Sequence, residues 1–87
     1  MVQPNDVQPV TDLHQFESLL LSAGKTLVVA DFYARWCRPC MQIGPKIVKL
    51  AKDFEGIVYF LKVDVDVSKD VADKYKVKVR RKGRSNQ

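Results

Sequence analysis

Cysteine, histidine and long apolar runs are scarce in this sequence, and each shortage excludes a class of protein. Two cysteines among 87 residues are too few for a secreted disulfide scaffold. With the single histidine, His14, they supply fewer than the four ligands of a structural zinc site, so we expect no metal. No apolar run reaches the roughly 20 residues that span a bilayer, and no basic leader precedes Lys25. We therefore expect a cytoplasmic protein without a membrane segment.

Acidic residues are absent from the last part of the chain. All ten Asp and Glu residues precede residue 74, whereas residues 74–87 carry seven Lys and Arg. A basic terminal run of this kind is usually a solvated tail, so we expect residues 80–87 to be disordered. No aromatic residue after Tyr75 is available to stack on a base, and we do not expect nucleic acid as a partner.

Apolar runs and periodicity predict strands that alternate with helices. A weak edge strand is expected near Val7 and Val10, and continuous apolar runs at 27–33 and 57–63 predict two buried parallel strands. Helices are expected after each strand. This order, β-α-β-α-β-α, implies right-handed crossovers and a mostly parallel sheet covered by helices, which is an α/β fold.

The helix boundaries follow from capping residues. Thr11 can cap the first helix and Gly24 can end it, while Ser68 can cap the last one. The middle helix should run from the cysteines to Phe54, with Pro45 inside it. Its apolar positions recur at helical spacing and predict one buried stripe, made of Ile43, Ile47, Leu50, Ala51 and Phe54.

Both cysteines lie at the junction between the 27–33 run and the middle helix. Cys37 and Cys40 form a C-x-x-C pair, which at a strand-to-helix junction is a redox signature. Unpaired backbone N–H groups at a helix start favour a thiolate. A purely structural disulfide is the alternative, although it would close almost no chain.

The residues around this pair resemble the thioredoxin family. The similar segments are Val29–Cys40, Pro45, Lys62–Asp66 and Lys74-Tyr75, within a stretch from about Val7 to about Val79. The resemblance implies a thioredoxin-like fold and a protein disulfide reductase that needs no bound cofactor. It also implies a role in electron transport and cell redox homeostasis. Protein disulfides would be the substrates, and a thioredoxin reductase would be the electron donor.

Site roles follow from the same resemblance. Cys37, at the exposed start of the helix, would attack the substrate disulfide, and the more buried Cys40 would resolve the mixed disulfide. Trp36, Arg38 and Pro39 would form the docking surface.

Asp31 and Lys62 complete the expected site. Asp31 stands in an otherwise apolar strand, and the resemblance implies that it relays the proton of Cys40; a buried structural carboxylate is the alternative. Lys62 would lie on the adjacent strand and modulate Asp31, or else be a lysine with its stem on the apolar surface.

The sequence departs from the family pattern at two places. Arg38 replaces a typical Gly and should stabilise the Cys37 thiolate. After Val79 the family continues with a cis-proline, two strands and a closing helix, whereas Arg81 stands at the proline position. We therefore expect residues 1–79 to form an incomplete thioredoxin-like domain that lacks those elements and has an open sheet edge. The alternative function is a catalytically weak isoform that acts as a binding or self-associating module through that edge.

Overall fold

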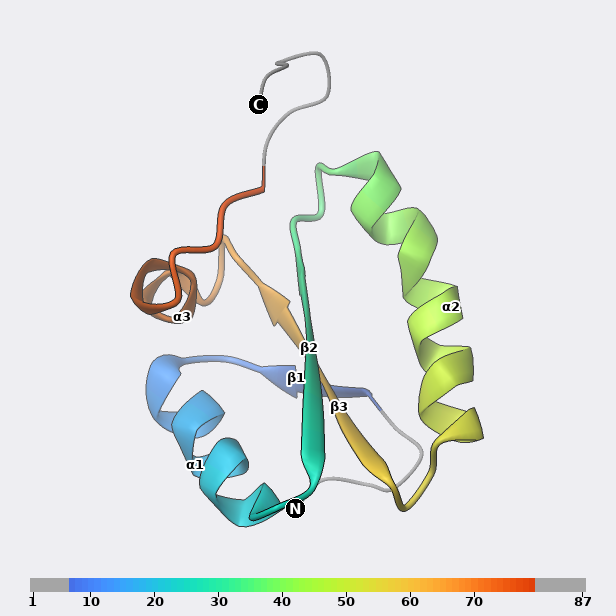
Figure 1. Cartoon of the computed structure of the whole chain (residues 1–87). Helices are drawn as coiled ribbons and strands as arrows, with labels where there is room; N and C mark the ends of the chain where they lie inside the picture. Colours follow the sequence, from blue (N-terminus) through green and yellow to red (C-terminus); the bar gives the residue numbers. More distant parts are fainter. Residues whose placement is uncertain (1–6, 80–87) are drawn as a thin grey trace.

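The computed structural model describes residues 7–79, and these form three strands and three helices in strict alternation (Figure 1). The elements are β1 (Val7–Val10), α1 (Leu13–Ala23), β2 (Leu27–Tyr33), α2 (Arg38–Asp53), β3 (Val58–Asp64) and α3 (Lys69–Lys74). Strand β3 lies between β1 and β2, and both pairings are parallel. The predicted α/β fold is therefore confirmed.

The edges of this three-stranded sheet are β1 and β2. Pro9 fits in β1 because an edge strand does not need every backbone N–H. Strand β2 has a composition typical of a central strand, with apolar residues on both faces, but within residues 7–79 only β3 pairs with it.

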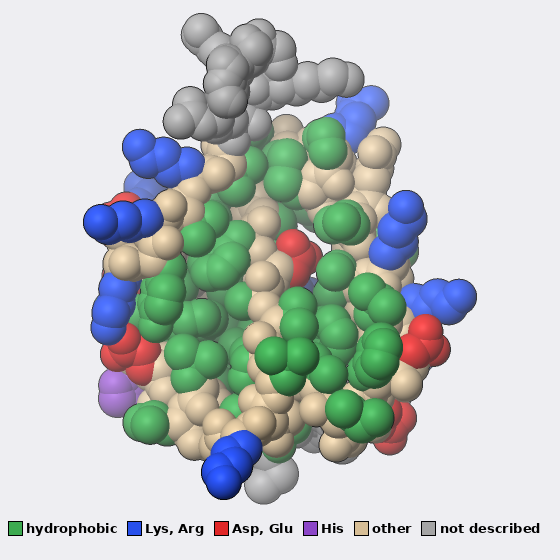
Figure 2. Space-filling model, in the orientation of Figure 1, with side chains coloured by type: hydrophobic (Ala, Val, Ile, Leu, Met, Phe, Trp, Pro, Cys, Tyr) green, Lys and Arg blue, Asp and Glu red, His purple; other side chains and the backbone are tan. Residues whose placement is uncertain are grey.

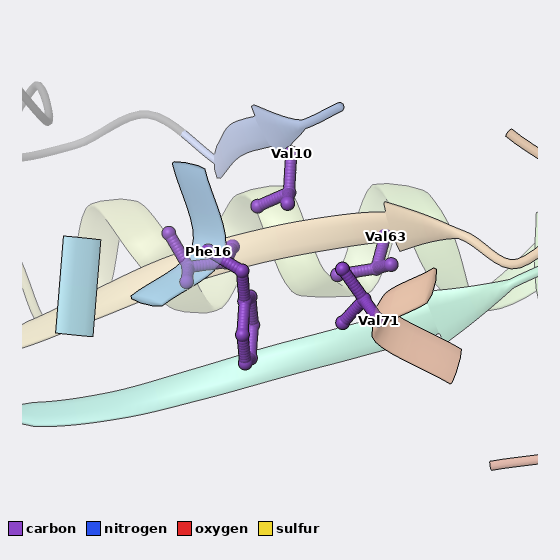
Figure 3. Close-up of a cluster of buried hydrophobic side chains, with 5 residues drawn as sticks. Val10, Phe16, Val63 and Val71 are labelled. Carbon is purple, nitrogen blue, oxygen red and sulfur yellow. The ribbon is translucent and has the colours of Figure 1, made fainter. Parts of the chain in front are cut away.

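Helices α1 and α3 cover one face of the sheet, and α2 covers the other (Figure 1). On the α1 face, the buried side chains of the three elements β1, α1 and β3 meet one residue of α3 (Figure 3). This cluster consists of Val10, Phe16, Leu61, Val63 and Val71. The ring of Phe16 also contacts Tyr75 edge to face, at 5.2 Å between centroids.

On the face of the sheet that α2 covers, fewer side chains are buried. Its buried cluster is Ala51, Val58 and Phe60, with Ile47 partly buried against it. The predicted buried stripe of α2 is therefore wrong at three positions, because Ile43, Leu50 and Phe54 are 45%, 41% and 44% exposed. The apolar stripe of α2 is wider than the surface that the three described strands offer to it.

The capping residue of α1 also differs from the prediction. Asp12, and not Thr11, is the N-cap, and its side chain accepts a hydrogen bond from the Gln15 N–H at 2.8 Å. Gly24 ends α1, as predicted, and has a positive φ of 60°. Ser68 precedes α3, but its hydroxyl donates to the carbonyl of Val10 at 3.0 Å instead of capping the helix.

Two expectations concern residues beyond those that the structure describes. Residues 80–87, expected as a basic tail, and Arg81, expected at the proline position, both lie outside residues 7–79. Within residues 7–79, none of the helices combines the length and the apolar character needed to cross a membrane.

Candidate active site

The two cysteines occupy the start of α2. Cys37 is the N-cap residue, and its sulfur accepts a hydrogen bond from the Cys40 N–H at 3.3 Å. The two residues form a disulfide, with their Cα atoms 5.3 Å apart. Pro39 lies in the first turn, where its missing N–H costs no helical hydrogen bond. Both cysteines are partly exposed.

A cavity lies behind Cys40, between α2 and the sheet. Its volume is about 280 Å³, and its lining includes Asp31, Cys40 and Lys62. A water molecule occupies roughly 30 Å³ in the liquid, so the cavity has room for water between the carboxyl and the sulfur. The cavity is therefore lined by all three residues that were predicted to resolve the mixed disulfide, relay its proton and modulate that relay, namely Cys40, Asp31 and Lys62.

Asp31 and Lys62 are direct neighbours across the β2–β3 pair, where their Cα atoms are in register. Burial raises the pKa of Asp31 above its ordinary value of 3.8, and the Lys62 ammonium partly opposes this rise. Asp31 is thus an acid whose proton is held more tightly than in an exposed aspartate. A carboxyl in that state suits proton exchange with a thiol.

Tyr33 is a residue of this cavity that the sequence analysis missed. It follows Asp31 by two residues in β2, so both side chains lie on the α2 face of the sheet. Burial raises the pKa of its phenol above 10.0, and the nearby Asp64 carboxylate adds to the rise. The strand alternation beside Asp31 was the signal that could have identified it.

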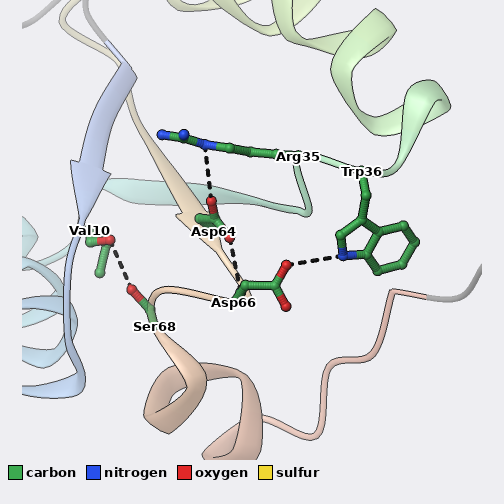
Figure 4. A network of polar contacts seen from close by, with 6 residues as sticks. All are labelled: Val10, Arg35, Trp36, Asp64, Asp66 and Ser68. Atoms are coloured by element: carbon green, nitrogen blue, oxygen red, sulfur yellow. Dashed lines mark hydrogen bonds and ion pairs between the residues drawn. The ribbon is translucent and has the colours of Figure 1, made fainter.

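Trp36 is held by a polar network at the carboxyl ends of β2 and β3 (Figure 4). Its indole N–H donates to Asp66 at 3.0 Å, and the Asp66 backbone N–H donates to the buried Asp64 at 2.9 Å. Arg35 closes the network with an ion pair to Asp64, at 3.5 Å between Nε and Oδ2. Sequence reasoning gave Arg35, Asp64 and Asp66 no role, although both aspartates follow the expected strand.

The remaining predicted docking residues are exposed. Arg38 and Pro39 are the first two residues of α2, and Trp36 beside them is 45% exposed. Trp36, Arg38 and Pro39 are therefore exposed residues next to the two cysteines in the sequence. In the part of the chain that the structure describes, no His, Cys, Asp or Glu cluster could hold a metal ion.

The family model for thioredoxin matches residues 7–80. Thioredoxin from the sponge Geodia cydonium is 45% identical over 62 residues, which cover 71% of this chain and 58% of that protein. Thioredoxin-T of Drosophila melanogaster is 42% identical over 71 residues, covering 82% of this chain and 45% of its own length. Pig thioredoxin is 43% identical over 72 residues, which cover 83% of this chain and 68% of the pig protein. The chain thus spans about half to two thirds of the length of these relatives.

Solved structures agree with this assignment. Thioredoxin of Fasciola hepatica superposes with a TM-score of 0.81 at 38% identity, covering 84% of this chain and 69% of that one. Schistosoma mansoni thioredoxin superposes with a TM-score of 0.80 at 34% identity, covering 88% of this chain and 69% of that one. Family model, relatives and structures all coincide with the segment that carries the Cys37–Cys40 disulfide, and the chain belongs to the thioredoxin family.

Proposed function

We propose that this chain is a thiol–disulfide oxidoreductase that reduces protein disulfides through Cys37 and Cys40. One observation carries the proposal: the two cysteines form a disulfide at the start of α2, directly in front of a cavity that contains Asp31. A pair at a helix start can open and close without a change of fold, because its ring includes only one turn of chain. The family membership supports the same chemistry.

The first step is an attack by Cys37. Its thiolate displaces one sulfur of the substrate disulfide, which leaves as a thiolate, and a mixed disulfide between Cys37 and the substrate forms. The N-cap position favours the anionic form of Cys37, because the unpaired N–H groups of the first turn point toward it; in the oxidised chain the Cys40 N–H already donates to its sulfur. Cys37 is therefore the proposed nucleophile.

The second step requires that Cys40 lose its proton. Asp31, ionised, accepts this proton, directly or through water in the cavity. The Cys40 thiolate then attacks the Cys37 sulfur, the Cys37–Cys40 bond forms, and the substrate leaves as its second thiolate. Two electrons have passed to the substrate, whose thiolates take up protons from Asp31 and solvent. Lys62 adjusts the proton affinity of Asp31 through its charge.

Substrate docking is assigned to Trp36, Arg38 and Pro39, the exposed residues next to the two cysteines in the sequence. The Asp66 hydrogen bond orients the Trp36 indole, while the charge of Arg38 favours acidic segments of the partner. The electron donor is proposed to be a thioredoxin reductase that uses NADPH. We place the function in electron transport and redox homeostasis in the cytoplasm, where such pairs are kept reducible. The working domain is residues 1–79, with residues 80–87 as a basic tail.

A turnover assay tests the proposal. With NADPH and a thioredoxin reductase, the chain should reduce a protein disulfide, and Cys37→Ser should reduce the rate to that of the reductase alone. Leu21→Ser is the matched control, because Leu21 is 83% exposed on α1 and belongs to no proposed site. A folded wild-type chain that shows no turnover, or Cys37→Ser turnover equal to wild type, would contradict the proposed activity.

A further inference from the structure

Helix α2 carries basic side chains along its outer face, and we call this row the basic stripe. All of its members are exposed: Arg38, Lys46, Lys49 and Lys52. At 3.6 residues per turn they project within an arc of roughly 120°, on the side of the helix opposite to Ile47 and Ala51, which pack on the sheet. Figure 2 shows Lys and Arg side chains that project from the α2 side of the molecule, on the right, away from the sheet.

The described structure does not neutralise the charges of the basic stripe. Within residues 7–79 the ion pairs are Arg35–Asp64 and Lys74–Glu17, and neither involves a residue of α2. The acidic residue that α2 does contain, Asp53, is the last residue of the helix. The stripe therefore presents one sign of charge to its surroundings along most of the helix.

Helix stability does not account for the basic stripe. Lys49 stands three residues from both Lys46 and Lys52, and like charges at this spacing destabilise a helix. Arg38 lies in the first turn, where the helix dipole disfavours a cation, and only Lys52, in the last turn, is favoured by it. A helix surface that only faces water normally mixes both signs of charge. A single sign, kept at a cost to the helix, indicates a ligand of opposite charge.

The basic stripe begins beside the proposed nucleophile. Arg38 directly follows Cys37, the N-cap residue of α2. Between Arg38 and Lys52 the helix rises by about 21 Å, at about 1.5 Å per residue. An extended chain covers this length with about six residues, at about 3.3 Å each. A substrate segment of that length can therefore lie along the stripe while the disulfide next to it reaches Cys37.

We propose that the basic stripe binds an acidic segment, about six residues or longer, next to the disulfide of the substrate protein. This inference rests on the proposed reduction of protein disulfides and names the substrate class of that reaction. Complementary charge raises the rate of encounter and orients the segment along α2. A protein ligand is favoured over a nucleic acid, because α2 contains no aromatic side chain that could stack on a base and the stripe begins beside a cysteine that attacks disulfides.

Peptide kinetics with the reduced chain test the proposal. Two peptides carry the same cysteine, linked by a disulfide to thionitrobenzoate, followed by a run of Asp residues or a run of Asn residues of the same length. Attack by Cys37 on the peptide sulfur releases the coloured thiolate, which gives the rate. At about 0.01 M ionic strength the Debye length of about 30 Å exceeds the length of the stripe, and the Asp peptide should react at least about fivefold faster than the Asn peptide. At about 1 M salt the two rates should converge.

A matched pair of double variants locates the effect. Lys46→Gln/Lys49→Gln should lower the ratio of the Asp-peptide rate to the Asn-peptide rate at least about threefold. Lys25→Gln/Lys69→Gln removes the same charge from exposed lysines outside α2 and should keep the wild-type ratio. All four lysines are exposed, so both proteins should fold, which circular dichroism checks. An Asp peptide that reacts no faster than the Asn peptide, or an equal fall of the ratio in both variants, would overturn the proposal.

Binding of the acidic run alone separates this proposal from the proposed activity. By fluorescence anisotropy at about 0.01 M ionic strength, the oxidised chain should bind a cysteine-free Asp peptide, and Lys46→Gln/Lys49→Gln should raise the dissociation constant at least about threefold. Binding without reduction of either disulfide peptide would refute the proposed activity and uphold the acidic-segment site. Reduction without binding would uphold the activity and overturn the site. A single-stranded oligonucleotide of equal charge that binds more tightly than the Asp peptide, and loses affinity in the same variant, would identify a nucleic acid as the ligand and also overturn the proposal.

Discussion

At the residue scale, the proposed role of Asp31 in proton transfer requires a charge that its partial burial makes costly for stability. Its carboxyl is partly buried beside an apolar helix face, which disfavours the charged form, and Lys62 offsets only part of that cost. The unfolded chain binds this proton less tightly than the folded chain. Stability therefore falls as pH rises from the ordinary Asp pKa of 3.8 through the raised pKa of the folded state, and the cost persists at neutral pH.

Asp31→Asn separates these two effects. At pH 7 we expect the variant to resist urea unfolding better than wild type, with the difference disappearing below pH 3.8, where the carboxyl is protonated in both states. Turnover should fall by about tenfold or more, because Cys40 loses its proton acceptor. Urea titrations across pH and the protein-disulfide assay provide the two readouts. An Asn variant that is less stable at pH 7 and equally active would show that Asp31 is a structural carboxylate.

Lys62→Met provides the complementary control. Removal of the ammonium should raise the Asp31 pKa further, so the pH at which turnover reaches half its maximum should move upward. A lysine that merely lies with its stem on the apolar surface would leave that midpoint where it is in wild type.

At the element scale, local pattern predicted most boundaries. The apolar run 27–33 coincides with β2, and the helix expected to reach Phe54 ends there, with Phe54 as its C-cap. The N-cap residues were less predictable, because two adjacent polar residues can each accept the first free N–H groups of a helix. Thr11 and Asp12 can both begin a helix, and the structure selects Asp12; α3 contributes too, since Asp70 accepts the Leu13 N–H at 2.9 Å. That contact joins residues 57 positions apart and leaves no local signal.

The α1 cap gives a matched pair of variants. Asp12→Ala should lower the free energy of unfolding by about 0.5–2 kcal/mol, because the Gln15 N–H loses its acceptor. Thr11→Ala removes only an exposed hydroxyl contact with Gln15 and should cost clearly less. Chemical denaturation of both proteins measures the difference. The reverse order of effects would assign the cap to Thr11.

At the scale of the whole molecule, the sequence predicted the fold, but not the contacts around the predicted site residues. Asp31 and Lys62 lie on adjacent strands as expected, since consecutive β-α-β units place parallel strands side by side, and Cys40 lines the same cavity. The Arg35–Asp64–Asp66–Trp36 network depends on two strand ends meeting in space, which no local pattern encodes. The exposure of part of the apolar stripe of α2 was also not predictable from the sequence. Periodicity identifies an apolar stripe, but it does not give the width of the sheet that the stripe packs against.

A trapping experiment tests most directly the proposal that Cys37 attacks the substrate disulfide and Cys40 resolves the mixed disulfide. A Cys40→Ser chain incubated with a protein disulfide should accumulate a mixed disulfide through Cys37, identified by mass spectrometry and reversed by dithiothreitol. The matched Cys37→Ser chain should trap little or none, because Cys40 lies inside the first turn of α2 and lines the cavity between the helix and the sheet. Equal trapping through Cys40, or no mixed disulfide in a folded Cys40→Ser chain, would contradict the proposed mechanism.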